Sequence, residues 1–150
     1  MGKKQLQELE KNGRYFSVPT GTSMWPMLLH KRDIVEVHKP DGEAKRLDVV
    51  LYCIGEKGIL HRVLRVKEDI YIIVGDNCWR KEYVPKSEVV GIAVRFCRKG
   101  RWIEATDRGY RLYAHFWAGT FFLRRPFLYL RDLGKRVIRK MKRILHREQA

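Results

Sequence analysis

Residues 60–74 read LHRVLRVKEDIYIIV, two runs rich in β-branched residues on either side of the polar turn Lys67-Glu68-Asp69. The first run alternates, and runs of this kind joined by a short turn predict a β-hairpin over Ile59–Val66 and Ile70–Val74. Similar runs predict further strands at residues 34–37, 49–54 and 89–96, with turn signals at 40–42 and 55–58. Short strands with regular breaks indicate a mainly β protein with a folded, partly barrel-like antiparallel sheet.

Helices are expected at the two ends of the chain. The first residues predict a short helix over 3–11 that is closed near Gly13. Aromatic side chains gather between Tyr110 and Leu123, and Arg124-Arg125-Pro126 interrupts them. Beyond, apolar residues recur at 130, 133, 137, 141 and 144, which predicts an amphipathic helix. We therefore expect three parts: an N-terminal helix (1–13), a β domain (14–100) and a basic, aromatic C-terminal tail (101–150).

A candidate nucleophile lies in the segment Gly21-Thr22-Ser23-Met24. This segment follows the extended run 15–19 and precedes the polar turn 30–33. A serine at the mouth of a cleft can expose its Oγ, and donors beside it can stabilise a developing oxyanion. The alternative is an ordinary turn serine after a glycine.

Two later segments complete a pattern with Ser23. His61-Arg62-Val63 places a histidine on a predicted strand, and Gly75-Asp76-Asn77 follows the end of the next one. This order and spacing resembles the type I signal peptidase family and the related self-cleaving SOS-type repressors, over roughly residues 14–97. The resemblance implies a β fold of the signal-peptidase/repressor type.

The resemblance also implies a role for each residue. Ser23 would be the nucleophile. His61 would be the general base, at the place where bacterial members carry a lysine, because a neutral imidazole can accept the hydroxyl proton. Asp76 would orient the histidine, and Glu82 is the nearest counterpart of a second acidic residue in the histidine-containing branch. If His61 is instead an ordinary strand histidine, Lys31 and Lys45 are the remaining candidate bases.

The chain departs from the signal peptidases at the oxyanion site. Those enzymes read Ser-Gly-Ser-Met and use the first serine as a donor, whereas this chain has Gly21 at that place. The remaining donors are the backbone N–H of Ser23 and the hydroxyls of Thr20 or Thr22. A missing donor costs roughly 10²–10³-fold in rate if nothing replaces it.

The positive charge is concentrated near the C-terminus. Residues 98–150 contain 15 Lys or Arg and 4 Asp or Glu, so they carry +11 of the total formal charge of +15. A basic amphipathic helix with aromatic residues can lie on an anionic membrane surface, bind nucleic-acid phosphates, or pack on the β domain. No DNA-reading motif is visible, so nucleic acid is a weak candidate partner and membrane contact is preferred.

Location and cofactors follow from what the composition lacks. No stretch has the roughly 18 apolar residues of a membrane span, and the first residues do not resemble a secretory signal. We therefore expect a cytoplasmic protein, peripheral to the inner face of the membrane. Cys53, Cys78 and Cys97 have no Cys-x-x-Cys spacing, which argues against a zinc site or a disulfide framework. We expect no metal or other cofactor.

These observations predict a serine endopeptidase of the signal-peptidase type that cleaves an extended precursor or leader peptide. The substrate would lie as an added strand beside the cleft, and the resemblance implies small residues before the scissile bond. The alternative is a repressor-like regulatory or binding module at the membrane surface, either non-enzymatic or self-cleaving. Such repressors carry an Ala-Gly cleavage site before the catalytic domain, whereas the pair occurs here behind it, at Ala118-Gly119, which weighs against this alternative.

Overall fold

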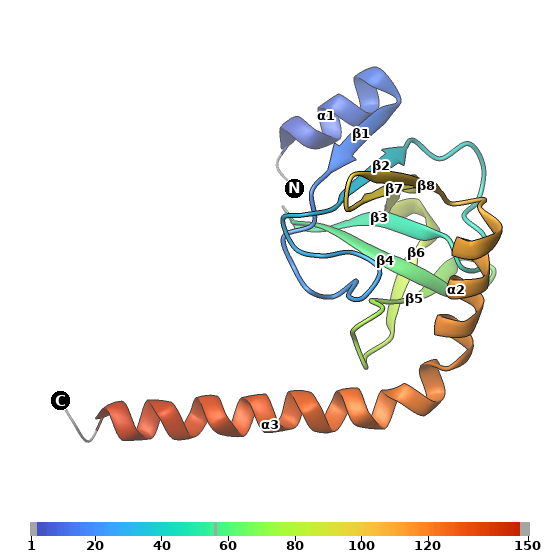
Figure 1. Cartoon of the computed structure of the whole chain (residues 1–150). Coiled ribbons are helices and arrows are strands. Elements are labelled where there is room, and N and C mark those ends of the chain that lie inside the picture. Colours follow the sequence, from blue (N-terminus) through green and yellow to red (C-terminus); the bar gives the residue numbers. More distant parts are fainter. Residues whose placement is uncertain (1–2, 56, 148–150) are drawn as a thin grey trace.

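The computed structural model describes residues 3–55 and 57–147, and Figure 1 shows its elements. The helices are α1 (Lys3–Asn12), α2 (Arg108–Gly119) and α3 (Phe121–Arg147), and a 3-10 turn, η1, covers Lys86–Glu88. The strands are β1 (Arg14–Ser17), β2 (Ile34–His38), β3 (Val49–Ile54), β4 (Lys57–Val66), β5 (Ile70–Val74), β6 (Glu82–Pro85), β7 (Val89–Arg98) and β8 (Arg101–Glu104).

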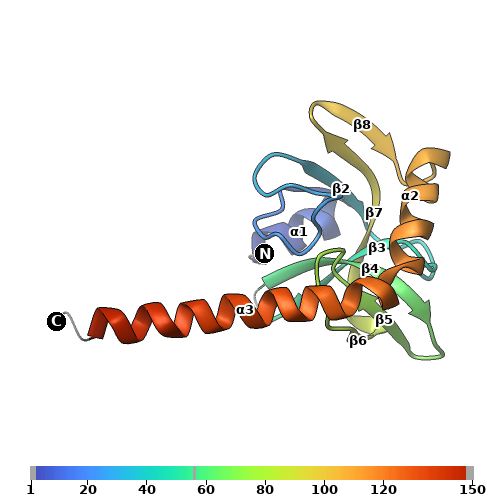
Figure 2. The same cartoon turned by 60° about the horizontal axis from the view of Figure 1, so that its bottom comes forward.

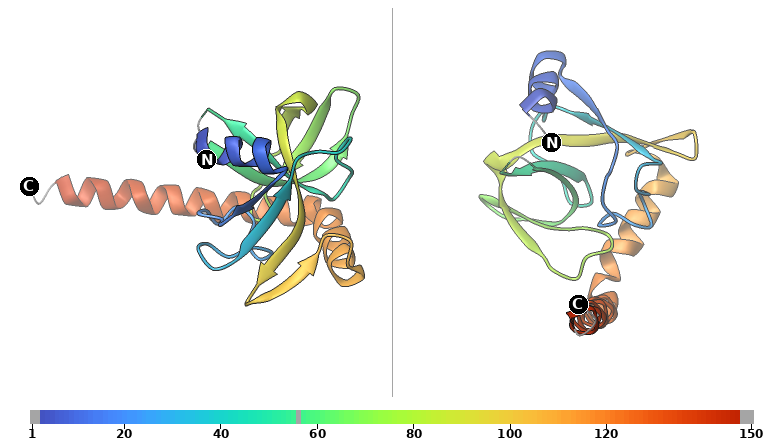
Figure 3. Two further views of the ribbon diagram at one scale, coloured as in Figure 1. Left: turned by 90° about the horizontal axis from the view of Figure 1, so that it is seen from above. Right: turned by 90° about the vertical axis from the view of Figure 1, so that its left-hand side faces the viewer.

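The strands form one sheet in the order β1-β2-β7-β3-β4-β5-β6, with β8 paired to β7. Every one of these pairings is antiparallel. The sheet curls strongly, as the right-hand view of Figure 3 shows, and its register shifts within β2, β3 and β4. A mainly antiparallel β fold with a short N-terminal helix and C-terminal helices is therefore confirmed.

Strand β3 lies between two buried clusters. Val49 and Leu51 pack with Phe96 in one cluster, while Val50 and Tyr52 belong to the other. Successive side chains of a strand point to opposite faces, so a strand covered on both faces requires an unbroken apolar run. The sequence of residues 49–54 has that run.

The predicted hairpin is confirmed as β4 and β5, in register through Val63 opposite Ile73. The short strands β6 and β8 were not predicted. β8 pairs with β7 beyond the expected domain boundary at residue 100. Tyr110 and Ala114 of α2 are buried in the core cluster around Phe96. The packed β domain thus includes β8 and α2, which the sequence placed in the tail.

Helix α3 passes through Pro126 without a break, although an interruption was expected there. The break lies instead at Thr120, between α2 and α3. Proline has no N–H, so Pro126 cannot donate the hydrogen bond that the sixth residue of a helix normally makes to the carbonyl oxygen four residues earlier, here that of Phe122. Figures 1 and 2 show the C-terminal half of α3 projecting beyond the β domain. Among the described residues, no helix is both long and apolar enough to span a membrane.

Candidate active site

Ser23 lies between β1 and β2 on a loop that the core anchors. Met24 and Met27 follow it and are almost fully buried. A hydrogen bond of 2.8 Å from the Lys31 N–H to the carbonyl oxygen of Pro19 closes the loop. Apolar packing directly after Ser23 therefore fixes the place of this half-buried serine.

Ser23 and His61 approach each other at Gly75. A Cβ atom on Gly75 would lie 2.7 Å from the Ser23 carbonyl oxygen and 2.9 Å from Nε2 of His61. Real Cβ atoms do not come so close to such atoms, so the glycine provides the space in which the serine loop and β4 meet. The structure thus brings together Ser23 and His61, which are far apart in the sequence.

The other ring nitrogen of His61 faces two oxygen atoms. Nδ1 lies 3.3 Å from Oε1 of Glu82 and 3.2 Å from the hydroxyl oxygen of Tyr52. The Tyr52 hydroxyl donates its own proton to the Glu82 carboxylate. Both oxygens are therefore acceptors toward Nδ1, which places the imidazole proton on Nδ1 and the free lone pair on Nε2. That lone pair belongs to the nitrogen that borders Gly75, where the backbone of Ser23 also approaches.

The surroundings keep Glu82 ionised and Tyr52 neutral. The hydrogen bond from His61, which outweighs the effect of burial, lowers the pKa of the Glu82 carboxyl, and the bond from Tyr52 adds to it. Burial, followed by the neighbouring carboxylate, raises the pKa of Tyr52. A negative charge is thus held beside an imidazole that is itself only 4% exposed.

Asp76 lies elsewhere than the resemblance implies. Its two carboxylate oxygens accept hydrogen bonds of 2.8 Å from Nε and Nη2 of Arg62, and the Tyr113 hydroxyl donates to it at 3.1 Å. His61 and Arg62 are neighbours on β4, so their side chains point to opposite faces. The acid that pairs with Arg62 is therefore not the one that contacts His61. In the structure Glu82 occupies the place beside the histidine where Asp76 was expected.

Arg62 and Asp76 form a buried salt bridge that connects β4 to the turn after β5, and hydrogen bonds of Arg62 and Asp76 with tyrosines join both to α2. Both side chains are excluded from water, and Nη1 of Arg62 also donates to the Leu47 carbonyl oxygen and the Tyr110 hydroxyl. Burial is the largest influence and opposes the charge on Arg62, but the charge and hydrogen bonds of Asp76 and the contact with Tyr110 together raise the pKa of the guanidinium. This network holds Gly75 in place beside the serine loop.

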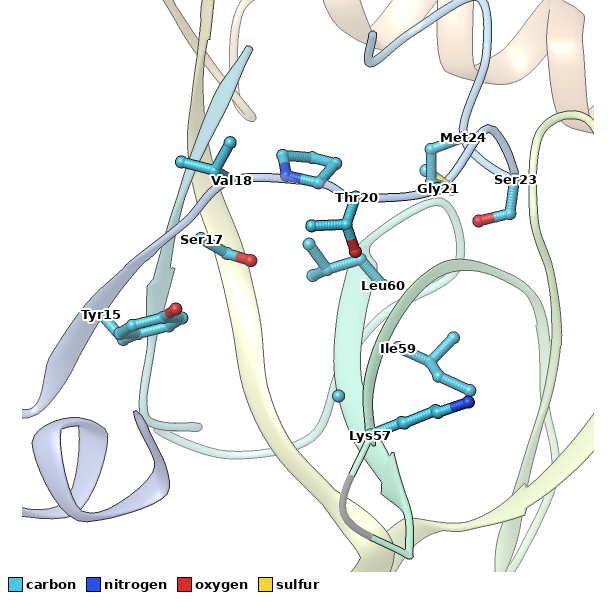
Figure 4. A pocket seen from close by; sticks show the side chains of 12 residues that line it. Tyr15, Ser17, Val18, Thr20, Gly21, Ser23, Met24, Lys57, Ile59 and Leu60 are labelled. Carbon is cyan, nitrogen blue, oxygen red and sulfur yellow. The ribbon is translucent and has the colours of Figure 1, made fainter. Parts of the chain in front are cut away.

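A cleft of about 470 Å³ opens beside Ser23, between the extended segment after β1 and the start of β4 (Figure 4). Within the described chain, the part of β4 that pairs with β5 is residues 62–66. Residues 57–61 of β4 pair with β3 on one edge, and their other edge is unpaired. β1 likewise pairs on one side, with β2. Two strand edges therefore border the cleft, and such edges can bind an extended peptide.

The oxyanion donors named from the sequence lie on the serine loop. Across residues 3–55 and 57–147, neither the N–H nor the Oγ of Ser23 has a hydrogen-bond partner. Thr20 lines the cleft, and its side chain points into it (Figure 4). Lys57 also lines the cleft, which the sequence gave no reason to expect.

The competing nucleophile and bases fit less well. The sulfur of Cys78 also borders Gly75, but burial and then Glu82 raise the pKa of its thiol to about 11. It is thus protonated near neutral pH and a poor nucleophile. Lys31 and Lys45 are exposed on turns, and neither lines the cleft beside Ser23.

Tyr52 is the residue that sequence reasoning missed most clearly. Val50 pairs with His61 across the two strands, and Tyr52 lies two residues further along β3 on the same face. Alternation along residues 49–54 could have identified it once the pairing of β3 with β4 was known. Comparison of the chain with protein-family models and with curated proteins finds no match.

Proposed function

We propose that this protein is a serine endopeptidase of the signal-peptidase type, with Ser23 as nucleophile and His61 as general base. One observation carries the proposal. Nε2 of His61 and the backbone of Ser23 meet at Gly75, while Glu82 accepts from the opposite ring nitrogen. A nucleophile, a base and a group that orients the base thus follow one another in the order that acyl transfer requires.

In the proposed reaction the Ser23 Oγ attacks the scissile carbonyl as its proton passes to Nε2 of His61. The imidazolium that forms is stabilised by the Glu82 carboxylate at Nδ1. The Ser23 N–H, which is free in the described structure, and the Thr20 hydroxyl are the candidate donors to the oxyanion. His61 then protonates the leaving amine, and water attacks the acyl-enzyme by the same route.

The substrate is an extended segment of a precursor or leader peptide. It would lie in the cleft as an added strand between residues 57–61 of β4 and the segment after β1. The resemblance to the signal peptidases implies small side chains before the scissile bond. The self-cleaving alternative needs Ala118–Gly119 in extended form, whereas these residues end the helix α2.

Helix α3 supports a peripheral location on the inner face of a membrane. Residues 121–147 contain ten Lys or Arg and a single Asp. The helix also exposes large apolar side chains along its length, among them Phe122, Phe127, Val137 and Met141. Exposed apolar surface flanked by cations fits anionic lipid, with about 1 kcal/mol from each basic residue near the surface.

The test is cleavage of a quenched, alanine-rich peptide library by the full chain, read by fluorescence and mass spectrometry. We expect Ser23→Ala and His61→Ala to lose activity to a similar degree, because residues that act as one unit show non-additive losses. Ser87→Ala is the matched control and should stay active, because Ser87 is exposed on η1 and does not line the cleft. Circular dichroism checks that each variant folds. Undiminished cleavage by folded Ser23→Ala would overturn the proposal.

A further inference from the structure

Asn77, in the turn after β5, makes hydrogen bonds to the serine loop, the loop between β1 and β2 that carries Ser23. The Asn77 N–H donates to the carbonyl oxygen of Ser23 at 2.7 Å. Its side-chain Nδ2 donates to the carbonyl oxygen of Thr22 at 3.1 Å. One residue thus bonds to two consecutive carbonyls at the nucleophile and limits how Ser23 can move relative to His61.

The same asparagine is held from the other side by α3. Nη1 of Arg131 donates to Oδ1 of Asn77, and Nη2 donates to its carbonyl oxygen at 3.1 Å. Arg131 is in turn oriented by Asp132, which accepts from Nε at 3.0 Å. A guanidinium only donates and a carbonyl only accepts, so these contacts leave the Asn77 amide a single orientation. In that orientation Nδ2 faces Thr22.

Other contacts fix the start of α3 on this turn. Nη1 of Arg124 donates to the Asp76 carbonyl oxygen at 3.0 Å, and the indole N–H of Trp117 donates to the same oxygen at 2.9 Å. The rings of Trp79 and Tyr129 meet edge to face, 4.9 Å apart. The first turns of α3 therefore belong to the packed structure around Gly75, whereas the rest of the helix projects from it (Figure 1).

We propose that Asn77 and Arg131 are positioning residues that hold Ser23 in its reactive place, so that α3 is part of the catalytic unit as well as a surface for lipid. This inference rests on the proposed peptidase function. Neither residue touches the reacting atoms. They act through the backbone of residues 22 and 23, and a displacement of about 1 Å at a nucleophile can lower the rate about 10²-fold.

The first experiment compares Arg131→Gln with Arg108→Gln in the full chain, without lipid, on the quenched peptide library. Arg108 is exposed on α2 and has no partner within the described residues, so its variant makes the same change of charge away from the turn. We expect kcat to fall about 10- to 100-fold in Arg131→Gln, with KM within about twofold. Arg131→Lys can make one of the two hydrogen bonds and should be intermediate. Arg108→Gln should match the wild type.

Asn77→Asp separates positioning from simple docking of α3. A carboxylate still accepts from Arg131 but has no proton for the Thr22 carbonyl oxygen. We expect its kcat to fall as far as that of Asn77→Ala, at unchanged helix content. A fully active Asn77→Asp, or equal kcat in the Arg131 and Arg108 variants, would overturn the inference. A loss of kcat that disappears when the rates are corrected for the folded fraction of each variant would overturn the inference as well.

A second readout needs no substrate and keeps this inference separate from the proposed function. The Trp25 N–H donates to the same Thr22 carbonyl oxygen, at 3.2 Å. We expect its hydrogen exchange, followed by NMR, to be about tenfold faster in Arg131→Gln and Asn77→Asp, and unchanged in Arg108→Gln. Unchanged exchange in all three variants refutes the positioning role. Altered exchange in a protein whose Ser23→Ala variant cleaves normally refutes only the peptidase assignment.

Discussion

Replacing Glu82 by glutamine should lower the rate of cleavage while leaving the fold intact. The carboxylate oxygen lies 3.3 Å from Nδ1 of His61. Two unit charges at that distance interact by about 5 kcal/mol at an effective dielectric constant of about 20. This attraction exists only after His61 has taken the serine proton, so it stabilises the transition state and not the resting enzyme.

Solvent and the remaining hydrogen bond reduce this magnitude. The Glu82 side chain is 33% exposed, and glutamine keeps a carbonyl oxygen that can accept from Nδ1. We therefore expect a loss of about 2–3 kcal/mol, which corresponds to a fall of roughly 10²-fold in kcat. The assay is steady-state cleavage of a quenched alanine-rich peptide, with the melting temperature measured on the same sample.

Asp76→Asn is the informative comparison. It leaves the buried Arg62 guanidinium without its charged partner, and breaking a buried pair in this way costs about 3–5 kcal/mol of stability. We expect a large drop in melting temperature for this variant and a small one for Glu82→Gln. The opposite result, a stable but inactive Asp76→Asn beside a fully active Glu82→Gln, would show that Asp76 supports the base and that the reasoning from geometry is mistaken.

Three further outcomes are expected. Gly75→Ala should abolish cleavage, because its Cβ would meet the Ser23 carbonyl oxygen at 2.7 Å, whereas Gly109→Ala, which has open space around it, should remain active in the same peptide assay. The pKa of Glu82 is lowered from its ordinary value of 4.5. Its carboxylate therefore contributes stability above pH 4.5, and this contribution is lost as pH falls through the lowered pKa of the folded state. In urea unfolding, the wild type should have a higher free energy of unfolding than Glu82→Gln above pH 4.5, and the difference should vanish below the folded-state pKa. The double variant Val137→Asp/Met141→Asp should cosediment less with anionic vesicles than the wild type. Salt should weaken wild-type binding, because it screens the charges. Equal pelleting of the variant and the wild type at all salt concentrations would count against lipid contact by α3.

Local patterns were sufficient for most of the strands. Periodicity marks β3, β4 and β5 because each is long enough to bury a face, and the polar turn between the last two sets their pairing. Ser23 and His61 were proposed because the order of Gly-Thr-Ser, His-Arg-Val and Gly-Asp-Asn resembles that of the signal peptidases. The structure brings them together at Gly75.

The partner of His61 was decided only by the tertiary structure. In the sequence Asp76 and Glu82 are both acidic residues shortly after β5, and nothing local distinguishes them. Strand geometry does, because His61 and Arg62 face opposite sides of β4, so Asp76 pairs with the arginine while β6 brings Glu82 to the histidine. The burial of α2 was also decided only by the tertiary structure, because its Tyr110 and Ala114 lie in the core. The aromatic and basic residues of this helix allow contact with lipid, nucleic acid or protein. The sheet against which the helix packs determines which of its faces is buried.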